Sequence, residues 1–292
     1  MSSRLETLQV ARLAPRLLGD SAERVVEYLQ EQWTDAGGAA DRAGRADLYY
    51  TVFTLEGLLA LQAKPPRRRV LDYLESFGAG EALDLVHLSC LARCLAALDA
   101  PREGRLRSGL LQRLEAHRSK DGGYAAAPAR ERGTLYHAFL ALGAHQDLGG
   151  LPPEPARLCS SICALAAEDG SYSNEPELPI GNTPSTAAAV TLLRHLGGTP
   201  RADTGDWLLA RRHEQGGFLA IPEAPMPDLL STATALHALT SLGCSLEAVR
   251  EPCLDFVDTL WTGRAFCGTW ADDQADSEYT FYALLALGHL SL

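Results

Sequence analysis

EAPMPDLLSTATALHAL, residues 223–239, begins with prolines and an aspartate and then becomes a run of small and apolar residues. Apolar residues at helical spacing predict a helix, and here they cover nearly its whole circumference. A helix without a polar face is expected to be buried. Asp228 stands where this helix begins, and aspartate is a favoured N-cap. The same carboxylate could instead point into a cavity, and both interpretations remain open at this stage.

The pattern of a polar entrance followed by an alanine- and leucine-rich run repeats along the chain, at intervals of roughly 40 to 50 residues. The buried runs are 46–61, 83–98, 133–142, 185–193, 231–239 and 279–287, entered by Asp47, Asp84, Thr134, Ser185, Asp228 and Asp276. Amphipathic helices are expected before or between them, at 21–33, 67–77, 105–117, 154–168, 204–213 and 246–261. Such helix pairs cannot bury their apolar faces alone and must stack. Because the inner helices are small and apolar all round, we predict a closed all-α toroid of about six helix pairs, with residues 1–292 forming a single domain.

The loops between the helix pairs repeat as well. KDGGYAAAP (120–128), EDGSYSNEP (168–176), EQGGFLAIP (214–222) and FCGTWADD (266–273) share a glycine, one further residue and then an aromatic residue. Glycine permits the left-handed turn that ends a helix. The aromatic residues are expected to pack between neighbouring repeats.

Charge and hydropathy narrow the classes of partner. The net charge is −11, which argues against nucleic acid and anionic membrane surfaces as main partners. The chain contains no run of about 18 apolar residues, so no membrane span is expected, and its first twenty residues lack the apolar core of a signal peptide. The seven cysteines include no C-x-x-C spacing. We interpret them as mostly buried, reduced thiols of a cytoplasmic protein.

These features together resemble a known family. The Gly-x-aromatic loops, the DLYYT entrance at 47–51 and the six-pair rhythm are similar to those of the α/α-toroid proteins. The closest similarity is to the β subunits of protein prenyltransferases and to the squalene-cyclase-like repeats, and it extends from about Arg24 to Leu292. The resemblance implies an isoprenoid ligand in a central cavity. It also implies a helical protein partner, because the prenyltransferase β subunits function with a helical α subunit.

The resemblance does not extend to the zinc site of that family. The prenyltransferase β subunits hold zinc with an Asp and a Cys of a P-D-x-C entrance and with a His of a D-x-x-H-T entrance. Asp228 matches the aspartate, but Leu230 and Tyr279 stand at the positions of the cysteine and the histidine. Leucine supplies no ligand for zinc, which prefers thiolate, imidazole and carboxylate groups. The loop 218–228 also lacks the basic residues that neutralise a diphosphate in the family. Ordinary zinc-dependent prenylation of a protein cysteine is therefore not expected.

A second metal hypothesis comes from ADDQADSEYT, residues 271–280. Its D-D-x-x-D pattern, formed by Asp272, Asp273 and Asp276, is one with which class-one isoprenoid enzymes bind Mg²⁺ and diphosphate. Acidic loops also arise by chance in an acidic protein, so a solvated loop is the alternative. The D-x-D-D acid of class-two terpene cyclases does not occur in the sequence.

Polar and aromatic residues near the helix entrances are the candidates for binding a substrate. Aromatic walls suit a long apolar ligand, histidine is poised to exchange protons near neutral pH, and small residues where helices converge leave room for a cavity. The predicted substrate-binding residues are Tyr50, Asp84, His87, Tyr136, His137, Ser231 and Phe281. Hydrogen-bonded or packed core residues are the alternative for each of them.

The sequence therefore favours a prenyltransferase-like toroid that binds a prenyl diphosphate or terpenoid in its central cavity. If the protein is an enzyme, we expect Asp228, Asp276 and Tyr279 at the reacting end, because a carboxylate that faces an apolar cavity has a raised pKa and suits a general acid. One alternative is a non-enzymatic scaffold that binds a protein partner. Another is a terpene-cyclase-like enzyme that uses an aspartic acid as its general acid.

Overall fold

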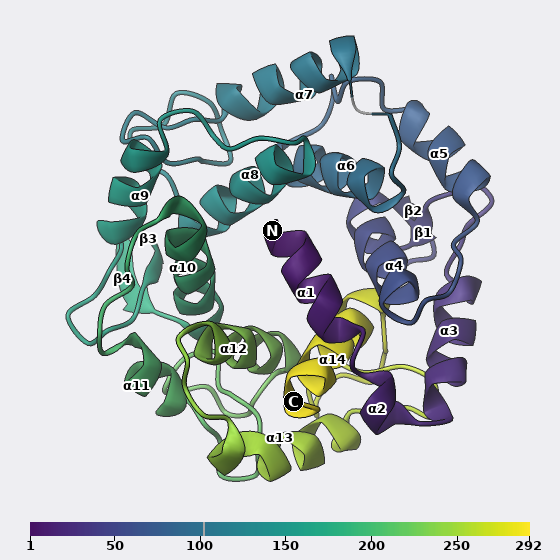
Figure 1. Cartoon of the computed structure of the whole chain (residues 1–292), viewed down its shortest axis with the longest axis vertical. Helices are drawn as coiled ribbons and strands as arrows, with labels where there is room; N and C mark the ends of the chain where they lie inside the picture. The colour runs from purple at the N-terminus through teal and green to yellow at the C-terminus, as the bar shows by residue number, and fades with distance from the viewer. Residues whose placement is uncertain (102) are drawn as a thin grey trace.

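The fold is a closed ring of paired helices (Figure 1). The structure, a computed structural model, describes residues 1–101 and 103–292. The inner helices are α4 (Leu48–Ala60), α6 (Leu85–Ala97), α8 (Leu135–Asp147), α10 (Thr183–Leu196), α12 (Leu229–Ser241) and α14 (Ser277–Leu290). The outer helices are α3 (Ser21–Glu31), α5 (Arg67–Glu75), α7 (Gly104–Ala116), α9 (Pro155–Cys163), α11 (Thr204–Leu209) and α13 (Glu247–Thr259). Each inner helix contacts the next, and α14 contacts α4, which closes the ring. The predicted all-α toroid is confirmed.

A polar side chain caps the beginning of every inner helix, where four backbone N–H groups lack partners within the helix. Five of the six predicted entrances are N-caps, namely Asp47, Asp84, Thr134, Asp228 and Asp276. The prediction of Ser185 is wrong. Asn182 caps α10 and accepts a hydrogen bond from the backbone N–H of Ser185. Pro184 is compatible with this earlier beginning, because proline is tolerated in the first turn of a helix.

The aromatic residues of the connecting loops are buried between repeats, as predicted for three of the four loops. Tyr124, Tyr172 and Phe218 are at most 1% exposed. In the last loop the buried residue is Phe266, whereas the predicted Trp270 is 39% exposed. The backbone of Phe266 forms an isolated antiparallel bridge with that of Trp261, just after outer helix α13. The backbone of Phe218 forms the same bridge with that of Arg212, just after α11, so Phe266 holds the equivalent position.

Two short antiparallel hairpins lie in the connections that enter inner helices. Strands β1 (Ala39–Ala40) and β2 (Ala46–Asp47) precede α4, and strands β3 (Ser173–Glu175) and β4 (Leu178–Gly181) precede α10. Both hairpins therefore lie at the end of the ring where the inner helices begin.

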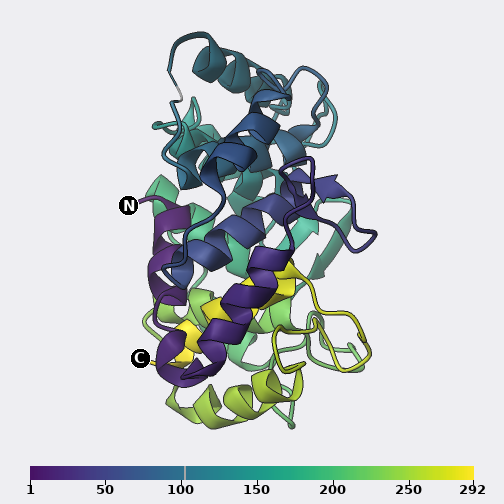
Figure 2. The same cartoon turned by 90° about the vertical axis from the view of Figure 1, so that its right-hand side faces the viewer.

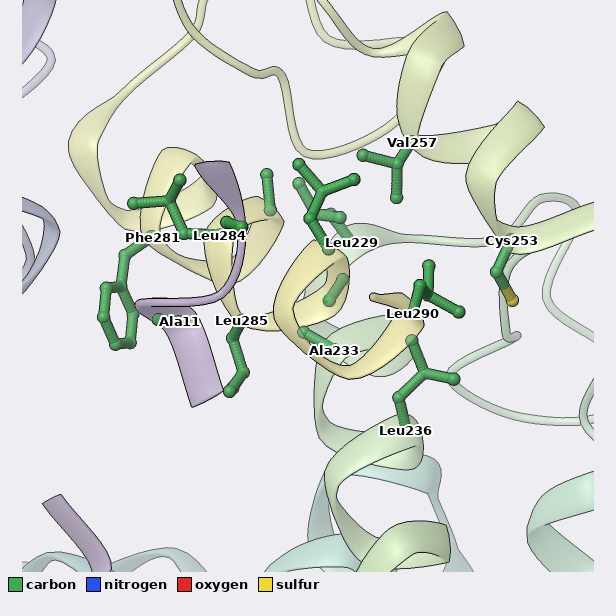
Figure 3. Close-up of a cluster of buried hydrophobic side chains, with 14 of the residues drawn as sticks. Ala11, Leu229, Ala233, Leu236, Cys253, Val257, Phe281, Leu284, Leu285 and Leu290 are labelled. Carbon is green, nitrogen blue, oxygen red and sulfur yellow. The ribbon is translucent and has the colours of Figure 1, made fainter. Parts of the chain in front are cut away.

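The hydrophobic core fills the space between the inner and outer helices. Figure 3 shows part of it, in which Leu229 and Leu236 of α12 lie near Cys253 and Val257 of α13 and Leu290 of α14. All five side chains are at most 1% exposed. Since the inner helices are packed on this side, their opposite faces are left to line the centre of the ring.

The chain begins with an element that the sequence did not reveal. Helix α1 (Ser3–Ala11) lies in the middle of the ring in Figure 1, and the short helix α2 (Pro15–Leu18) leads from it to the outer layer. The side view in Figure 2 places α1 at the same end of the molecule as the C-terminus. In the described part of the chain, no helix combines the length and the apolar character needed to cross a bilayer.

Candidate functional site

A mainly apolar cavity of about 250 Å³ occupies the centre of the ring. Its lining follows one rule of register: with few exceptions, the inner helices contribute residues from their second, fifth, sixth and ninth positions. This spacing marks one face of an α-helix. A residue further along an inner helix therefore lies deeper in the cavity. We call the second positions the rim layer, the fifth and sixth positions the middle layer, and the ninth positions the deep layer.

The three layers differ in chemistry. The rim layer contains Tyr49, Tyr136, Pro184, Leu230 and Glu278. The middle layer is rich in aromatic residues, namely Phe53, Phe139, Phe281 and Tyr282. The Phe53 ring lies 4.9 Å from that of Tyr49 and 5.6 Å from that of Tyr282, measured between ring centroids. The deep layer contains Arg93, Thr191, His237 and Leu285, and α1 adds Ser3 and Thr7. An aromatic middle section between two polar ends suits a ligand with a long apolar body.

Glu278 is the carboxylic acid of the cavity wall. The hydroxyl of Tyr49 donates a hydrogen bond to Glu278 Oε1 at 2.5 Å. Burial raises the pKa of Glu278 to about 7, although the Tyr49 hydrogen bond acts in the opposite direction. The nearby Asp276 adds to the rise, because a neighbouring negative charge disfavours ionisation. The side chain is therefore divided between its acid and carboxylate forms near neutral pH, as a general acid requires.

A second pocket of about 360 Å³ lies at the rim and is open to solvent. Glu278 lines both this rim pocket and the central cavity. Arg42 crosses the rim pocket, with its Nε 2.8 Å from Asp276 Oδ2 and its Nη2 2.7 Å from Asp272 Oδ2. Tyr50 and Tyr279 also line the pocket. Glu278 is thus in a position to exchange protons with solvent on one side and with a cavity ligand on the other.

Two of the predicted catalytic residues line the rim pocket, and the third serves as a helix cap. Asp276 caps α14, and Tyr279 lies three residues further along the helix. The two carboxylate oxygens of Asp228 accept hydrogen bonds from the backbone N–H and the hydroxyl of Ser231, at 2.7 and 2.6 Å. Burial raises the pKa of Asp228. Among the residues that the structure describes, Asp228 is not part of the lining of either pocket.

The predicted substrate-binding residues fall into three groups. Tyr136 and Phe281 line the central cavity, and Tyr50 lines the rim pocket. Ser231 is fully buried against Asp228.

The third group lies near the beginnings of α6 and α8. His87 Nδ1 lies 2.8 Å from Asp84 Oδ1, and His137 Nδ1 lies 2.7 Å from the Thr134 hydroxyl. As far as the structure describes the chain, Asp84, His87 and His137 are not in the lining of either pocket.

The carboxylates predicted to bind Mg²⁺ do not form a metal site. Arg42 occupies the space between Asp272 and Asp276, and Asp273 is exposed. Over residues 1–101 and 103–292, no group of three or more His, Cys, Asp and Glu side chains is placed to hold a metal ion. Of the residues that match the zinc ligands of protein prenyltransferases, Asp228 accepts hydrogen bonds from Ser231 with both carboxylate oxygens and Leu230 has no donor atom, and the loss of that zinc site stays a prediction.

The site residues predicted from the sequence did not include Glu278, Tyr49 or Arg42. A signal for Glu278 was available: it follows the cap Asp276 by two residues, as Tyr49 follows Asp47 and Tyr136 follows Thr134. The register that brings these three residues to the cavity is the same.

Comparison with known proteins agrees with this architecture. The chain matches the prenyltransferase alpha-alpha toroid domain over residues 16–87 and 186–291, and it belongs to that family. A search of curated protein sequences finds no match.

Solved structures with the same fold come from several kinds of protein. A variant of the type II terpene cyclase MstE from Scytonema, in complex with the substrate geranylgeranyl dihydroxybenzoate, has a TM-score of 0.64 at 13% identity and covers 98% of both chains. Protein geranylgeranyltransferase-I from Candida albicans, complexed with GGPP, has a TM-score of 0.64 at 14% identity over 90% of this chain and 89% of its own. A protein from Actinoplanes has a TM-score of 0.61 at 15% identity over 93% and 98%. Identities this low show the fold alone.

Proposed function

We propose that the toroid binds the hydrocarbon chain of an isoprenoid in its central cavity and that Glu278 protonates the end of this chain nearest the rim. The observation that carries the proposal is a carboxylic acid with a pKa of about 7 in the wall of an aromatic cavity. The relatives named above support the ligand class, because MstE and geranylgeranyltransferase-I were solved with geranylgeranyl compounds. The alternative of a scaffold fits less well, since a scaffold does not need an open cavity.

The proposed reaction begins with proton transfer from the Glu278 carboxyl to a carbon of an alkene. A C–H bond forms from the π electrons, the neighbouring carbon becomes a cation, and Glu278 becomes a carboxylate. Aromatic faces of the middle layer, such as those of Phe53 and Tyr282, stabilise a cation held above them. Water then accepts a proton from an adjacent carbon, whose C–H electrons form the new double bond, and the net change is an isomerisation. If a second alkene of the chain first attacks the cation and forms a C–C bond, the same loss of a proton to water completes a cyclisation. Solvent in the rim pocket returns a proton to Glu278.

The charges at the rim favour an uncharged substrate over a diphosphate. Asp272, Asp276 and Glu278 line the rim pocket, and the guanidinium of Arg42 is already bound to the two aspartates. Among the described residues that line this pocket, a diphosphate would meet carboxylates and no basic group other than the already paired Arg42. We therefore extend the proposal to a chemistry that needs neither zinc nor a diphosphate leaving group. Catalytic roles for Asp228, Asp276 and Tyr279, a helical partner chain and a cytoplasmic location stay predictions.

Deuterium incorporation in D₂O tests the proposal. Wild-type protein is incubated with neutral isoprenoids, and the products are analysed by mass spectrometry. Deuterium in an isomerised or cyclised product is the expected result. Glu278→Gln should reduce the rate by about 10²- to 10⁴-fold, the usual contribution of a general acid, while thermal shifts with the same compounds persist. The exposed Glu251→Gln is the matched control. Binding without deuterium transfer would overturn the role of Glu278, and no thermal shift with any isoprenoid would overturn the ligand class.

A further inference from the structure

Helix α1 closes one end of the ring and forms the floor of the cavity. It packs against α14, α4 and α8, near the ends of these inner helices. Figure 1 shows it across the centre of the ring, and Figure 2 shows it at one end. Ser3 and Thr7, one turn apart on α1, both line the central cavity. The cavity therefore ends at a surface that the first helix of the chain supplies.

Buried charges fix the position of this floor. Arg4 Nη1 lies 3.3 Å from Glu56 Oε1, and Arg4 Nε lies 3.3 Å from Asp147 Oδ1. Both acidic side chains are at most 3% exposed. On the same helix, Glu6 pairs with Arg194 of α10. Separating α1 from the ring would break the ion pairs that Arg4 makes with these buried carboxylates, which is costly.

The packing against α14 is also close. A Cβ atom on Gly288 would lie 2.1 Å from the carbonyl oxygen of Val10, so only glycine permits this approach of the two backbones. The position of Thr7 relative to the aromatic middle layer is thus set by contacts with three inner helices.

The floor limits the length of a ligand. The rim and deep layers are seven residues apart on the inner helices, which corresponds to a depth of about 10 Å. An apolar cavity of ~150 Å³ takes up benzene, so by proportion the 250 Å³ here accommodates about ten carbons. This is half the length of the geranylgeranyl chain bound by the structural relatives.

The floor is polar, unlike the middle of the cavity. The Thr7 hydroxyl donates to the carbonyl of Arg4 at 3.0 Å, and the Thr191 hydroxyl donates to the carbonyl of Ala187 at 3.3 Å. Their oxygen lone pairs are left as acceptors. Arg93 lines the same region and supplies N–H donors, and Glu56 Oε1, 3.8 Å from its Nε, is too distant for a strong hydrogen bond. Acceptors and donors together match a hydroxyl group, which both donates and accepts.

We infer that the ligand is an isoprenoid alcohol of about ten carbons, with its hydroxyl on the floor that α1 builds and its hydrocarbon end at Glu278. This inference rests on the proposed function and adds the length, polarity and orientation of the ligand. Thr7 contributes to both the length and the polarity of the site, because its side chain lines the end of the cavity that α1 closes.

Binding of a homologous series to three proteins tests the inference. Dissociation constants are measured for geraniol, farnesol and geranylgeraniol, and for the methyl ether of geraniol, which cannot donate a hydrogen bond. Wild-type protein should prefer geraniol over the longer alcohols and over the ether. Thr7→Val keeps the shape of the floor but removes the hydroxyl, so geraniol should bind about fivefold more weakly and the ether should be unaffected. Thr7→Ala deepens the floor and should shift the preference about fourfold towards farnesol.

The outcomes separate the two proposals. If isoprenoids bind with the same length and hydroxyl preferences in all three proteins, the floor inference is overturned and the cavity proposal stands. If none of the four compounds binds, both are overturned. Circular dichroism melts show whether the variants fold, and Thr7→Ser, which keeps the hydroxyl with a smaller side chain, provides a second measurement of length alone.

Discussion

Glu278 combines two features that seldom occur together, a polar carboxyl group and a place in an apolar wall. Its pKa of about 7 reflects burial that the Tyr49 hydrogen bond only partly offsets. A buried acid of this kind lowers the stability of the fold wherever it must ionise, and such groups often mark functional sites.

Replacement of Glu278 should therefore change stability in a pH-dependent way. The folded pKa is raised from the usual 4.5 to about 7, so the folded state binds more protons between these values and loses stability as pH rises through them. Glu278→Gln removes this loss. The variant should be more stable than wild type by about 1–3 kcal/mol at pH 8, and the difference should vanish near pH 4. Urea unfolding at both pH values measures it, and an equal effect at both would contradict the raised pKa.

Two substitutions of Asp228 distinguish a role as helix cap from a role in catalysis. Asp228→Asn preserves an oxygen that can accept from the Ser231 N–H, so its stability should remain close to that of wild type. Asp228→Ala removes the cap and should cost about 0.5–2 kcal/mol. Both free energies come from urea unfolding. If Asp228→Asn keeps its stability but stops deuterium transfer to the isoprenoid, Asp228 takes part in the chemistry; unchanged transfer leaves it as a cap.

The site could be predicted from the sequence only in part. Tyr136 and Phe281 could be proposed because aromatic residues near the entrances follow from the repeat; both line the central cavity, and their role in binding a substrate stays a prediction. Asp228 matched a family motif, but a motif match does not show whether a carboxylate caps its own helix or faces a ligand. Arg42 was out of reach, because its partner Asp276 is 234 residues away and only closure of the ring brings them together.

At the scale of single elements, α1 is the part of the fold that the sequence concealed. Its charged residues Arg4 and Glu6 suggest a solvent-exposed segment, yet they pair with residues of inner helices. Glu56 and Arg93 stand as charged residues inside apolar runs of the sequence. Each could therefore have been predicted to have an oppositely charged partner inside the ring. The inner helices were predictable because their composition repeats, whereas α1 occurs once.

The contact between α1 and α14 gives a prediction at this scale. Gly288→Ala places a methyl group against the Val10 carbonyl and should destabilise the protein by about 1–3 kcal/mol, the usual cost of overpacking. Gly143→Ala is the matched control on inner helix α8, where an added Cβ meets no atom within 4 Å. There the better helix propensity of alanine should give a neutral effect or a gain of up to about 1 kcal/mol. Denaturant unfolding measures the change in the free energy of unfolding for both variants. Equal changes would mean that α1 does not pack closely against α14 at Gly288.

The molecule as a whole is a ring whose centre is kept open at one end and closed at the other. The closed ring followed from the sequence, because six similar helix pairs with small apolar inner faces have few other ways to bury them. The depth and polarity of the cavity did not follow, since they depend on α1 and on which residues occupy the ninth positions. The family resemblance predicted the inner helices that form the wall of the cavity, but it did not predict α1, which forms its floor.

Closure of the centre also buries ionisable groups, so the free energy of unfolding of the whole molecule should depend on pH. His237 Nδ1 lies 3.0 Å from His289 Nε2, and burial lowers their pKa values to about 4 and about 3. Unfolded histidines bind protons near pH 6.5, so the unfolded state takes up more protons and stability falls as pH drops from 6.5 towards 4. Each histidine contributes up to about 1.4 kcal/mol per pH unit. His237→Gln should reduce the slope of unfolding free energy against pH by about one proton over this range. Urea unfolding at intervals from pH 4.5 to 7 tests this, and a slope equal to that of wild type would show that the pair is protonated in the folded ring.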